Sequence, residues 1–298
     1  MLKQLCLLLF TAQLQNAVAQ SKKEKKIQDL FQRAAEEIDD SSFTDAITTY
    51  KQIKKIVALN STAYSKAAYN TAYVYRLSGN DSVAKELFRD ILDSDFEEMD
   101  KGGRSLGIMG EPYALYKHNA CENLAQIELN AKNYSRALNY IEMFDKEYPY
   151  QHFCGNAVAS FEIFKTLLSA KASCGLKDSV KAIEVLLHSV FDNGLAENKA
   201  VVDEAIKLLR SKYDIDFLKT ELTKSLDGIT AEVTKNGKYK YTAHHIVILG
   251  SKIKIPDYYY RMDEPSNFDS LSELERRKFI VETSEFYERI FSRSPTKN

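Results

Sequence analysis

The sequence predicts a mainly α-helical chain of about four helix pairs, followed by a small β-hairpin part and a final helix. Two observations lead to this fold class. One spacing of small and large apolar residues recurs four times between residues 27 and 191, with the period of a helix. Beyond residue 228 the period changes to the alternation typical of strands. The 298 residues contain 18 Tyr and 15 Phe but only 11 Gly and 5 Pro, a composition that suits packed helices.

Residues 1–19 have the pattern of a secretory signal peptide. Lys3 supplies a positive start, an apolar stretch follows, and Ala17-Val18-Ala19 is a small-x-small cleavage site. Cleavage after Ala19 would make the protein periplasmic or secreted, and the alternative is a buried N-terminal helix. The apolar stretch is too short to span a bilayer, and no later segment reaches about 18 consecutive apolar residues. We therefore expect no transmembrane segment.

The repeated spacing has two parts. In the second helix of each pair, an alanine is followed four residues later by a large apolar residue: Ala46 and Tyr50, Ala84 and Phe88, Ala137 and Ile141, Ala182 and Leu186. Another alanine stands twelve residues before each of these: Ala34, Ala72, Ala125 and Ala170. Small residues at these positions predict helix hairpins whose helices cross closely.

The second and third pairs resemble the tetratricopeptide repeat family. The third reads Leu124 to Leu129 and then Asn133 to Leu138, and it ends at Tyr148-Pro149. The second adds Tyr75 in its first helix and Gly79 at the turn. The resemblance implies a right-handed α-solenoid over residues 20–227. Single amphipathic helix pairs must stack on neighbours to bury their apolar faces.

The resemblance also implies a concave groove that binds a peptide or protein partner. Its expected lining comes from the first helices of the second and third pairs: Lys66, Tyr69, Tyr73, Arg76, Asn119, Glu122 and Gln126. Tyr and Arg are the residue types that most often anchor interfaces. The alternative is an ordinary hydrated surface.

A Gly-rich insertion near residues 101–112 separates the second pair from the third. Arg104, Leu106, Ile108 and Met109 are its candidate partner contacts, since loops held by a rigid scaffold often bind. The alternative is that the insertion folds back over its own helices.

Two helices, Asn198–Tyr213 and Ile215–Leu226, are expected to cap the array. A second part at 228–298 begins with a hairpin around Asn236-Gly237, between strands Glu232–Lys235 and Lys238–Thr242. A second hairpin is expected from His245–Leu249 and Lys252–Ile255, which predicts a sheet of three or four strands. The last helix is expected from about Ser272 to Phe291, with Ser272 at its N-terminus.

No sequence motif indicates catalysis or a cofactor. The zinc pattern H-E-x-x-H, the G-x-S-x-G nucleophile elbow and the phosphate loop are absent from the sequence. His244 and His245 are adjacent on an expected strand and point to opposite faces, so they do not chelate one metal. We therefore expect a binding protein that is not an enzyme, with no metal or cofactor. The alternative is a helical array that presents a small C-terminal ligand-binding or catalytic module, motivated by these histidines and by Tyr258 to Arg261.

The net charge bears on the class of partner, and the number of cysteines bears on which disulfides can form. The formal net charge of −1 argues against nucleic acid as a partner. Cleavage would leave Cys121, Cys154 and Cys174, which allow one disulfide and one free thiol or no disulfide. Because each lies in an apolar helical context, buried structural thiols are the favoured interpretation.

Overall fold

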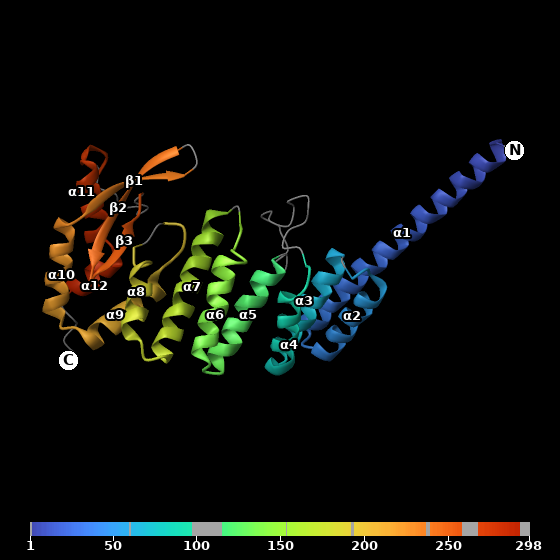
Figure 1. Cartoon of the computed structure of the whole chain (residues 1–298), viewed down its shortest axis with the longest axis horizontal. Helices are drawn as coiled ribbons and strands as arrows, with labels where there is room; N and C mark the ends of the chain where they lie inside the picture. Colours follow the sequence, from blue (N-terminus) through green and yellow to red (C-terminus); the bar gives the residue numbers. More distant parts are fainter. Residues whose placement is uncertain are drawn as a thin grey trace. The chain divides into compact units, whose positions relative to one another are not determined.

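The protein is mainly helical. The computed structural model describes residues 2–59, 61–96, 115–152, 154–191, 194–236, 239–257 and 268–292, without the side chains of residues 2–19, 234, 236, 239 and 269. This part holds twelve α-helices and one three-stranded antiparallel sheet, so the predicted mainly α class with a small β part is confirmed (Figure 1). Among the described helices, none combines the length and apolarity needed to cross a bilayer.

The chain divides into two compact units. The first comprises Met1–Ile127 and Met143–Pro149, and the second comprises Glu128–Glu142 and Tyr150–Asn298. The first unit holds four complete helices: α1 (Leu2–Asp39), α2 (Phe43–Ile56), α3 (Thr62–Leu77) and α4 (Asp81–Leu92). The division falls within α5 (Tyr116–Asn130) and α6 (Tyr134–Lys146).

The second unit contains the remaining helices and the sheet. Its helices are α7 (Gly155–Gly175), α8 (Ser179–Leu187), α9 (Lys199–Lys212), α10 (Ile215–Asp227), the 3-10 turn η2 (Phe268–Ser270), α11 (Glu273–Glu282) and α12 (Glu285–Phe291). Its strands are β1 (Thr230–Asn236), β2 (Tyr239–Ile248) and β3 (Ser251–Ile255), in the order β1-β2-β3.

The same three-residue turn joins the helices of all four pairs. Its middle residue has a positive φ, at Ser41 (60°), Gly79 (78°), Lys132 (62°) and Lys177 (64°). The next amide donates to the carbonyl five residues earlier, from Ser42 to Glu37, Asn80 to Tyr75, Asn133 to Glu128 and Asp178 to Ser173, over 2.7–2.9 Å. This is the Schellman closure of a helix C-terminus. Each pair therefore reverses direction by identical backbone geometry.

The alanines of the repeated spacing are buried at all eight positions. None has more than 2% of its surface exposed: Ala34, Ala46, Ala72, Ala84, Ala125, Ala137, Ala170 and Ala182. The large apolar residues that follow are also buried, with Tyr50 at 3%, Phe88 and Leu186 at 0% and Ile141 at 6%. A methyl group at each position leaves room for a neighbouring helix to approach closely.

Polar contacts supplement the apolar packing of the first unit. The Thr49 hydroxyl of α2 donates to the Glu37 carboxylate of α1 over 2.8 Å. The Asn70 amide of α3 donates to the Tyr50 hydroxyl of α2 over 3.2 Å. These bonds join successive helices by partners that are buried or half-buried, where a satisfied hydrogen bond is preferred to an isolated polar group.

One hydrophobic core holds the second unit together. It includes Leu186 of α8, Leu209 of α9, Leu222 of α10, Ile246 of β2 and Phe286 of α12. Peripheral contacts complete the packing: the Ser225 hydroxyl donates to the Val247 carbonyl over 2.5 Å, and the Arg210 guanidinium donates to the Arg289 carbonyl over 2.8 Å. The sheet and the last two helices therefore share their core with α7–α10.

Two details of the sequence prediction for the C-terminal strands are wrong. The strands expected at Lys238–Thr242 and His245–Leu249 are one continuous strand, β2, whose first half pairs with β1 and second half with β3. Asn236 pairs with Tyr239 and therefore belongs to β1, so it is not a turn residue as expected. Residues 237 and 238 themselves lie outside the described residues.

The expected final helix is two helices. Ser272 starts α11 with the predicted cap, accepting from the Glu275 amide, while the Glu275 carboxylate accepts from the Ser272 amide. Thr283 ends α11, and the Ser284 hydroxyl accepts from the Tyr287 amide over 3.2 Å to begin α12. A serine cap competes with helix continuation, and this explains the break.

Some predictions concern residues outside the described ranges and stay predictions, and the expectation of buried cysteines holds only in part. Signal peptide cleavage after Ala19 and the domain division at residue 228 stay predictions. The Gly-rich insertion, with Arg104, Leu106, Ile108 and Met109, lies outside the described residues, as do Tyr258 to Arg261. The three cysteines beyond residue 19 are not joined in disulfides. Cys121 is buried as expected, but Cys154 is half-buried and Cys174 is exposed, because Cys174 lies on the outer side of the last turn of α7.

Neighbouring alanines of α1 test whether the repeated positions are close-packed. We expect Ala34→Leu to lower the free energy of unfolding by about 1 to 3 kcal/mol, because three added carbons must displace buried neighbours. Ala35→Leu adds the same side chain at an exposed position of the same helix and should change stability little. Urea denaturation of both variants measures the difference. Equal effects would contradict close packing at Ala34.

Candidate functional site

A polar groove lies between α3 and α5 of the first unit. It encloses about 530 Å³. Its lining includes six of the seven residues expected from the sequence and two more, Leu77 and Asn123: Tyr69, Tyr73, Arg76, Leu77, Asn119, Glu122, Asn123 and Gln126. Asn123 lies one turn after Asn119 and Leu77 one turn after Tyr73, so their helical spacing was the available signal.

Lys66 is the expected residue that the groove lining does not include. Its ammonium lies 4.6 Å from the centre of the Phe31 ring of α1. A cation over an aromatic face is attracted by the ring quadrupole. Lys66 therefore contacts α1, whereas the groove residues of α3 lie along the side of the helix toward α5.

The Arg76 guanidinium is held by neutral amides. It donates to the Asn123 Oδ1 and, over 2.6 Å, to the Gln126 Oε1. The Asn123 Nδ2 donates in turn to the Tyr69 hydroxyl over 2.9 Å and to the Asn119 carbonyl over 2.6 Å. These bonds connect α3 to α5 and fix the position of the guanidinium in the groove.

No described carboxylate forms an ion pair with Arg76. Glu122 is the acidic residue of the groove, and its Oε1 accepts from the Gln126 Nε2 over 2.9 Å. Burial raises the pKa of the Glu122 carboxyl, while the charge of Arg76 and the bond from Gln126 lower it in part. A cation and an anion thus share the groove without direct contact, separated by the Gln126 amide.

Aromatic rings form one wall of the groove. The Tyr69 ring is only 3% exposed and stacks on Tyr73 with centroids 6.3 Å apart and planes 14° apart. It also packs against Phe88 at 5.7 Å and Tyr116 at 6.1 Å. Tyr69 is therefore part of the support, and the half-buried Tyr73 carries the ring surface that a partner can reach.

The two histidines of β2 lie in different surroundings. The His244 Nδ1 accepts from the Arg277 Nε over 3.2 Å, and Arg277 also donates to the Pro256 carbonyl over 2.7 Å. His245 points to the other face of the sheet, as expected for neighbouring strand residues, 4.0 Å from the Glu232 carboxylate. Burial and the neighbouring Lys252 lower the pKa of His245. Neither histidine lines the groove.

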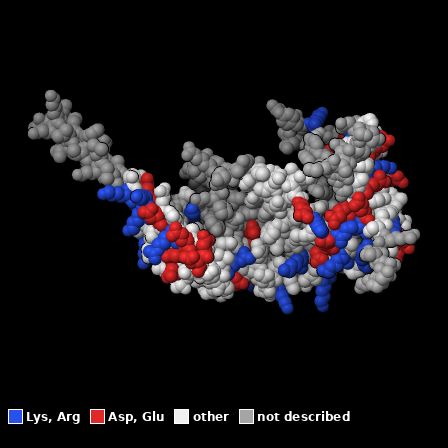
Figure 2. All heavy atoms as spheres, turned by 180° about the vertical axis from the view of Figure 1, so that it is seen from behind, with Lys and Arg blue, Asp and Glu red and all other residues white. Residues whose placement is uncertain are grey.

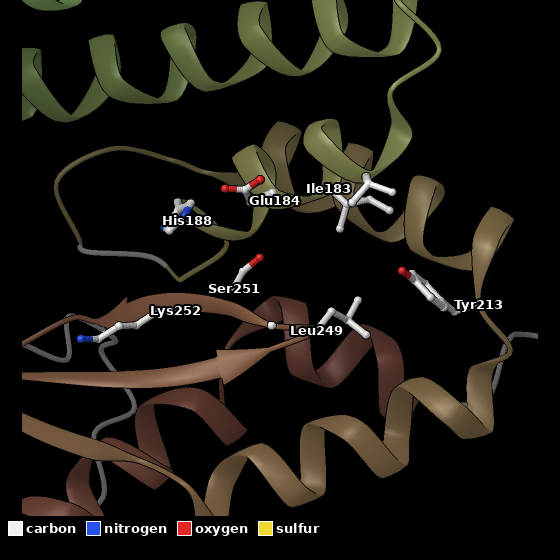
Figure 3. Close-up of a pocket in the computed structure, with 9 residues that line it drawn as sticks. Ile183, Glu184, His188, Tyr213, Leu249, Ser251 and Lys252 are labelled. Carbon is white, nitrogen blue, oxygen red and sulfur yellow. The ribbon is translucent and has the colours of Figure 1, made fainter.

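A second cavity of about 470 Å³ lies in the second unit, between α8 and the turn that joins β2 to β3 (Figure 3). Its lining is Val180, Ile183, Glu184, His188, Tyr213, Leu249, Gly250, Ser251 and Lys252. The volume is within the range of roughly 300–1,000 Å³ that small ligands use. The sequence placed Leu249 and Lys252 in an expected hairpin but marked none of these residues as part of a site.

No family model, curated protein or solved structure matches this chain. Within the described parts of the chain, no group of three or more His, Cys, Asp and Glu residues is arranged to hold a metal ion.

The raised pKa of Glu122 predicts a pH-dependent cost of folding. The folded state holds this proton more tightly than the unfolded state, whose glutamate pKa is about 4.3. The contribution of the protonated Glu122 carboxyl to the free energy of unfolding is therefore complete below that pH. It is lost as pH rises through the folded-state pKa of Glu122. Glu122→Gln removes the ionisation, so we expect the variant to gain stability relative to the native chain between pH 4 and pH 7.

Urea denaturation at both pH values measures this effect. Glu86→Gln, which alters an exposed glutamate of α4, is the matched control. A stability difference between Glu122→Gln and the native chain that stays constant with pH, or that reverses sign, would contradict the assignment.

Proposed function

We propose that this chain is a non-enzymatic scaffold of the tetratricopeptide repeat type, exported to the periplasm or secreted, that binds a peptide or protein partner. The binding site is the groove between α3 and α5. The observation that carries the proposal is the Arg76 guanidinium, which is fixed in that groove by two amide oxygens with no described carboxylate against it.

The repeat assignment rests on local geometry. Four identical Schellman turns and eight buried alanines recur with the intervals seen in the sequence. Repetition of this kind supports a right-handed solenoid of about four helix pairs, with α9 and α10 as its cap. In such an array the first helices of successive pairs line one continuous face, and this is the face on which the groove residues of α3 and α5 stand.

The groove chemistry suits a polypeptide. A guanidinium carries five N–H donors. The described bonds of Arg76 use one donor on Nη1 and one on Nη2. The remaining donors can bind a carbonyl or carboxylate of the partner with the strength of a charge-assisted hydrogen bond. Tyr73 and Leu77, which is 43% exposed, offer adjoining apolar surface. A peptide segment with an acidic or carbonyl group beside an apolar side chain complements both parts.

Charge distribution favours a protein partner over nucleic acid. Acidic and basic side chains are intermixed over the described surface seen in Figure 2, in keeping with the formal net charge of −1. Nucleic-acid binding requires a basic patch that neutralises phosphates. Together with the predicted signal peptide, these properties make the cell envelope the expected site of action and the assembly of envelope proteins the expected process.

The alternative function is a C-terminal ligand-binding or catalytic module presented by the helical array. One observation favours its ligand-binding form, the cavity between α8 and the β2–β3 turn. Of the histidines that first suggested it, His244 is bonded to Arg277, and neither His244 nor His245 lines that cavity.

Two exposed leucines provide a test of the groove. Leu77→Glu places a carboxylate in the groove next to the guanidinium, whereas Leu59→Glu changes a leucine that is 72% exposed and does not line the groove. Crosslinking pull-downs from the source cell envelope would compare both variants with the native mature chain. We expect Leu77→Glu to reduce recovery of a specific partner about tenfold or more, since it disrupts the centre of the interface.

The control should recover the same partner as the native chain, and thermal melts should show both variants folded. Equal recovery by all three proteins would exclude the groove as the site. Absence of any specific partner of the native chain would count against a scaffold function altogether.

A further inference from the structure

The second cavity lies along the free edge of a β-sheet. Among the described residues, β3 pairs with β2 on one side and with no strand on the other, because the sheet order is β1-β2-β3. The opposite side of β3 faces α8 across the cavity, to which Ser251 and Lys252 of the strand contribute (Figure 3). An edge strand carries main-chain donors and acceptors that a further strand can use.

The hairpin register shows which main-chain groups face the cavity. Leu249 and Gly250, with φ of 51° and 83°, form a two-residue turn of the type that requires positive φ at both positions. Ile248 and Ser251 flank the turn and are therefore a hydrogen-bonded pair, and Val247 and Lys252 are the next, non-hydrogen-bonded pair. The N–H and C=O of Lys252 consequently point away from β2, toward α8.

The cavity has an apolar end. Figure 3 shows Ile183, Leu249 and Tyr213 around it. Val180 of α8, one turn before Ile183, also lines the cavity and has a side chain that is 58% exposed. The Tyr213 ring is supported by Phe217, with centroids 5.5 Å apart. An apolar side chain placed here would remove exposed apolar surface from water on both sides of the cavity.

The other end is polar and electrically balanced. Glu184, His188 and Lys252 lie there in Figure 3. The Glu184 carboxylate is paired with Lys181 at 3.1 Å, and the Lys252 ammonium is paired with Glu232. With both charges compensated, this end offers donors and acceptors without a net charge. A neutral hydrogen-bonding side chain matches it better than a charged one, which would have to displace an existing partner.

We propose that the cavity binds a short extended segment of a partner polypeptide by strand addition to β3. The segment pairs with the Lys252 main chain, places an aliphatic or aromatic side chain between Val180, Ile183, Leu249 and Tyr213, and places a neutral polar side chain beside Glu184 and His188. Residues two apart in a strand point to the same side, so the apolar and polar residues are separated by one residue. This site is independent of the groove between α3 and α5.

A displayed library of random heptapeptides, panned against the full chain, tests this site. We expect enrichment of Ser, Thr, Asn or Gln two positions from an aliphatic or aromatic residue. Resynthesised peptides with blocked ends should bind Val180→Glu at least about tenfold more weakly than the native chain, because the new carboxylate occupies the apolar end. In the complex, hydrogen exchange of the Lys252 amide should slow at least about tenfold, because that amide becomes paired.

Val233→Glu is the matched control, since it makes the same change at a valine that is 71% exposed on β1 and outside the cavity. It and Leu77→Glu should bind the peptides like the native chain. Equal binding by Val180→Glu, or unchanged exchange at Lys252, would overturn strand addition. Failure to enrich any peptide would also overturn it. Self-association that Val180→Glu abolishes would identify a second copy of this chain as the occupant and overturn the proposal of a separate partner.

Discussion

Close contact between paired helices at alanine is the constraint on which the described helix pairs depend. Alanine at both crossing positions lets two backbones approach to a distance that a larger side chain would forbid. The Schellman turn then fixes where the second helix starts, because its three residues leave little conformational freedom. Three of the four turns place Ser or Lys at the positive φ that glycine adopts without cost. The packing of the pair therefore outweighs a local backbone penalty.

The groove uses this rigidity to hold a charge in a defined position. Arg76 is bonded to side-chain amides of α5, and Tyr69 beneath it is immobilised by aromatic neighbours. Amide oxygens satisfy a guanidinium without neutralising it, so its field remains directed into the groove. The nearby Glu122 limits that field, and the raised pKa of its carboxyl reflects the same sparse solvation. Fixed donors of this kind favour binding because little ordering is needed when a partner arrives.

Local sequence signals predicted the helices well. The features that were not predicted depend on contacts between residues distant in the sequence. Helix periodicity, alanine spacing and the Ser272 cap depend on residues within a few turns, and the corresponding helices are present. The burial of Tyr69 depends on Phe88 and Tyr116, which no local pattern connects to it. The position of Lys66 is set in the same way by Phe31 of α1.

The sheet and the second cavity illustrate the same limit. The continuity of β2 follows from its two partners, β1 and β3, each of which pairs with a different half. The cavity combines residues of α8 with a turn about sixty positions later, so periodicity cannot find it. Six of the groove residues, by contrast, were expected because the resemblance to the tetratricopeptide repeat family implies that the first helices of successive pairs line a groove.

The long-range contacts of the second unit also determine when its core can close. Arg289 contacts Asp203, 86 residues earlier, and Phe286 lies edge-on to Phe191. A helix pair closes over a few residues, whereas the Arg289–Asp203 contact joins residues 86 positions apart and carries a larger loop-closure entropy. Until α12 docks, the apolar side chains of α9 and α10 that pack against it therefore stay exposed to water.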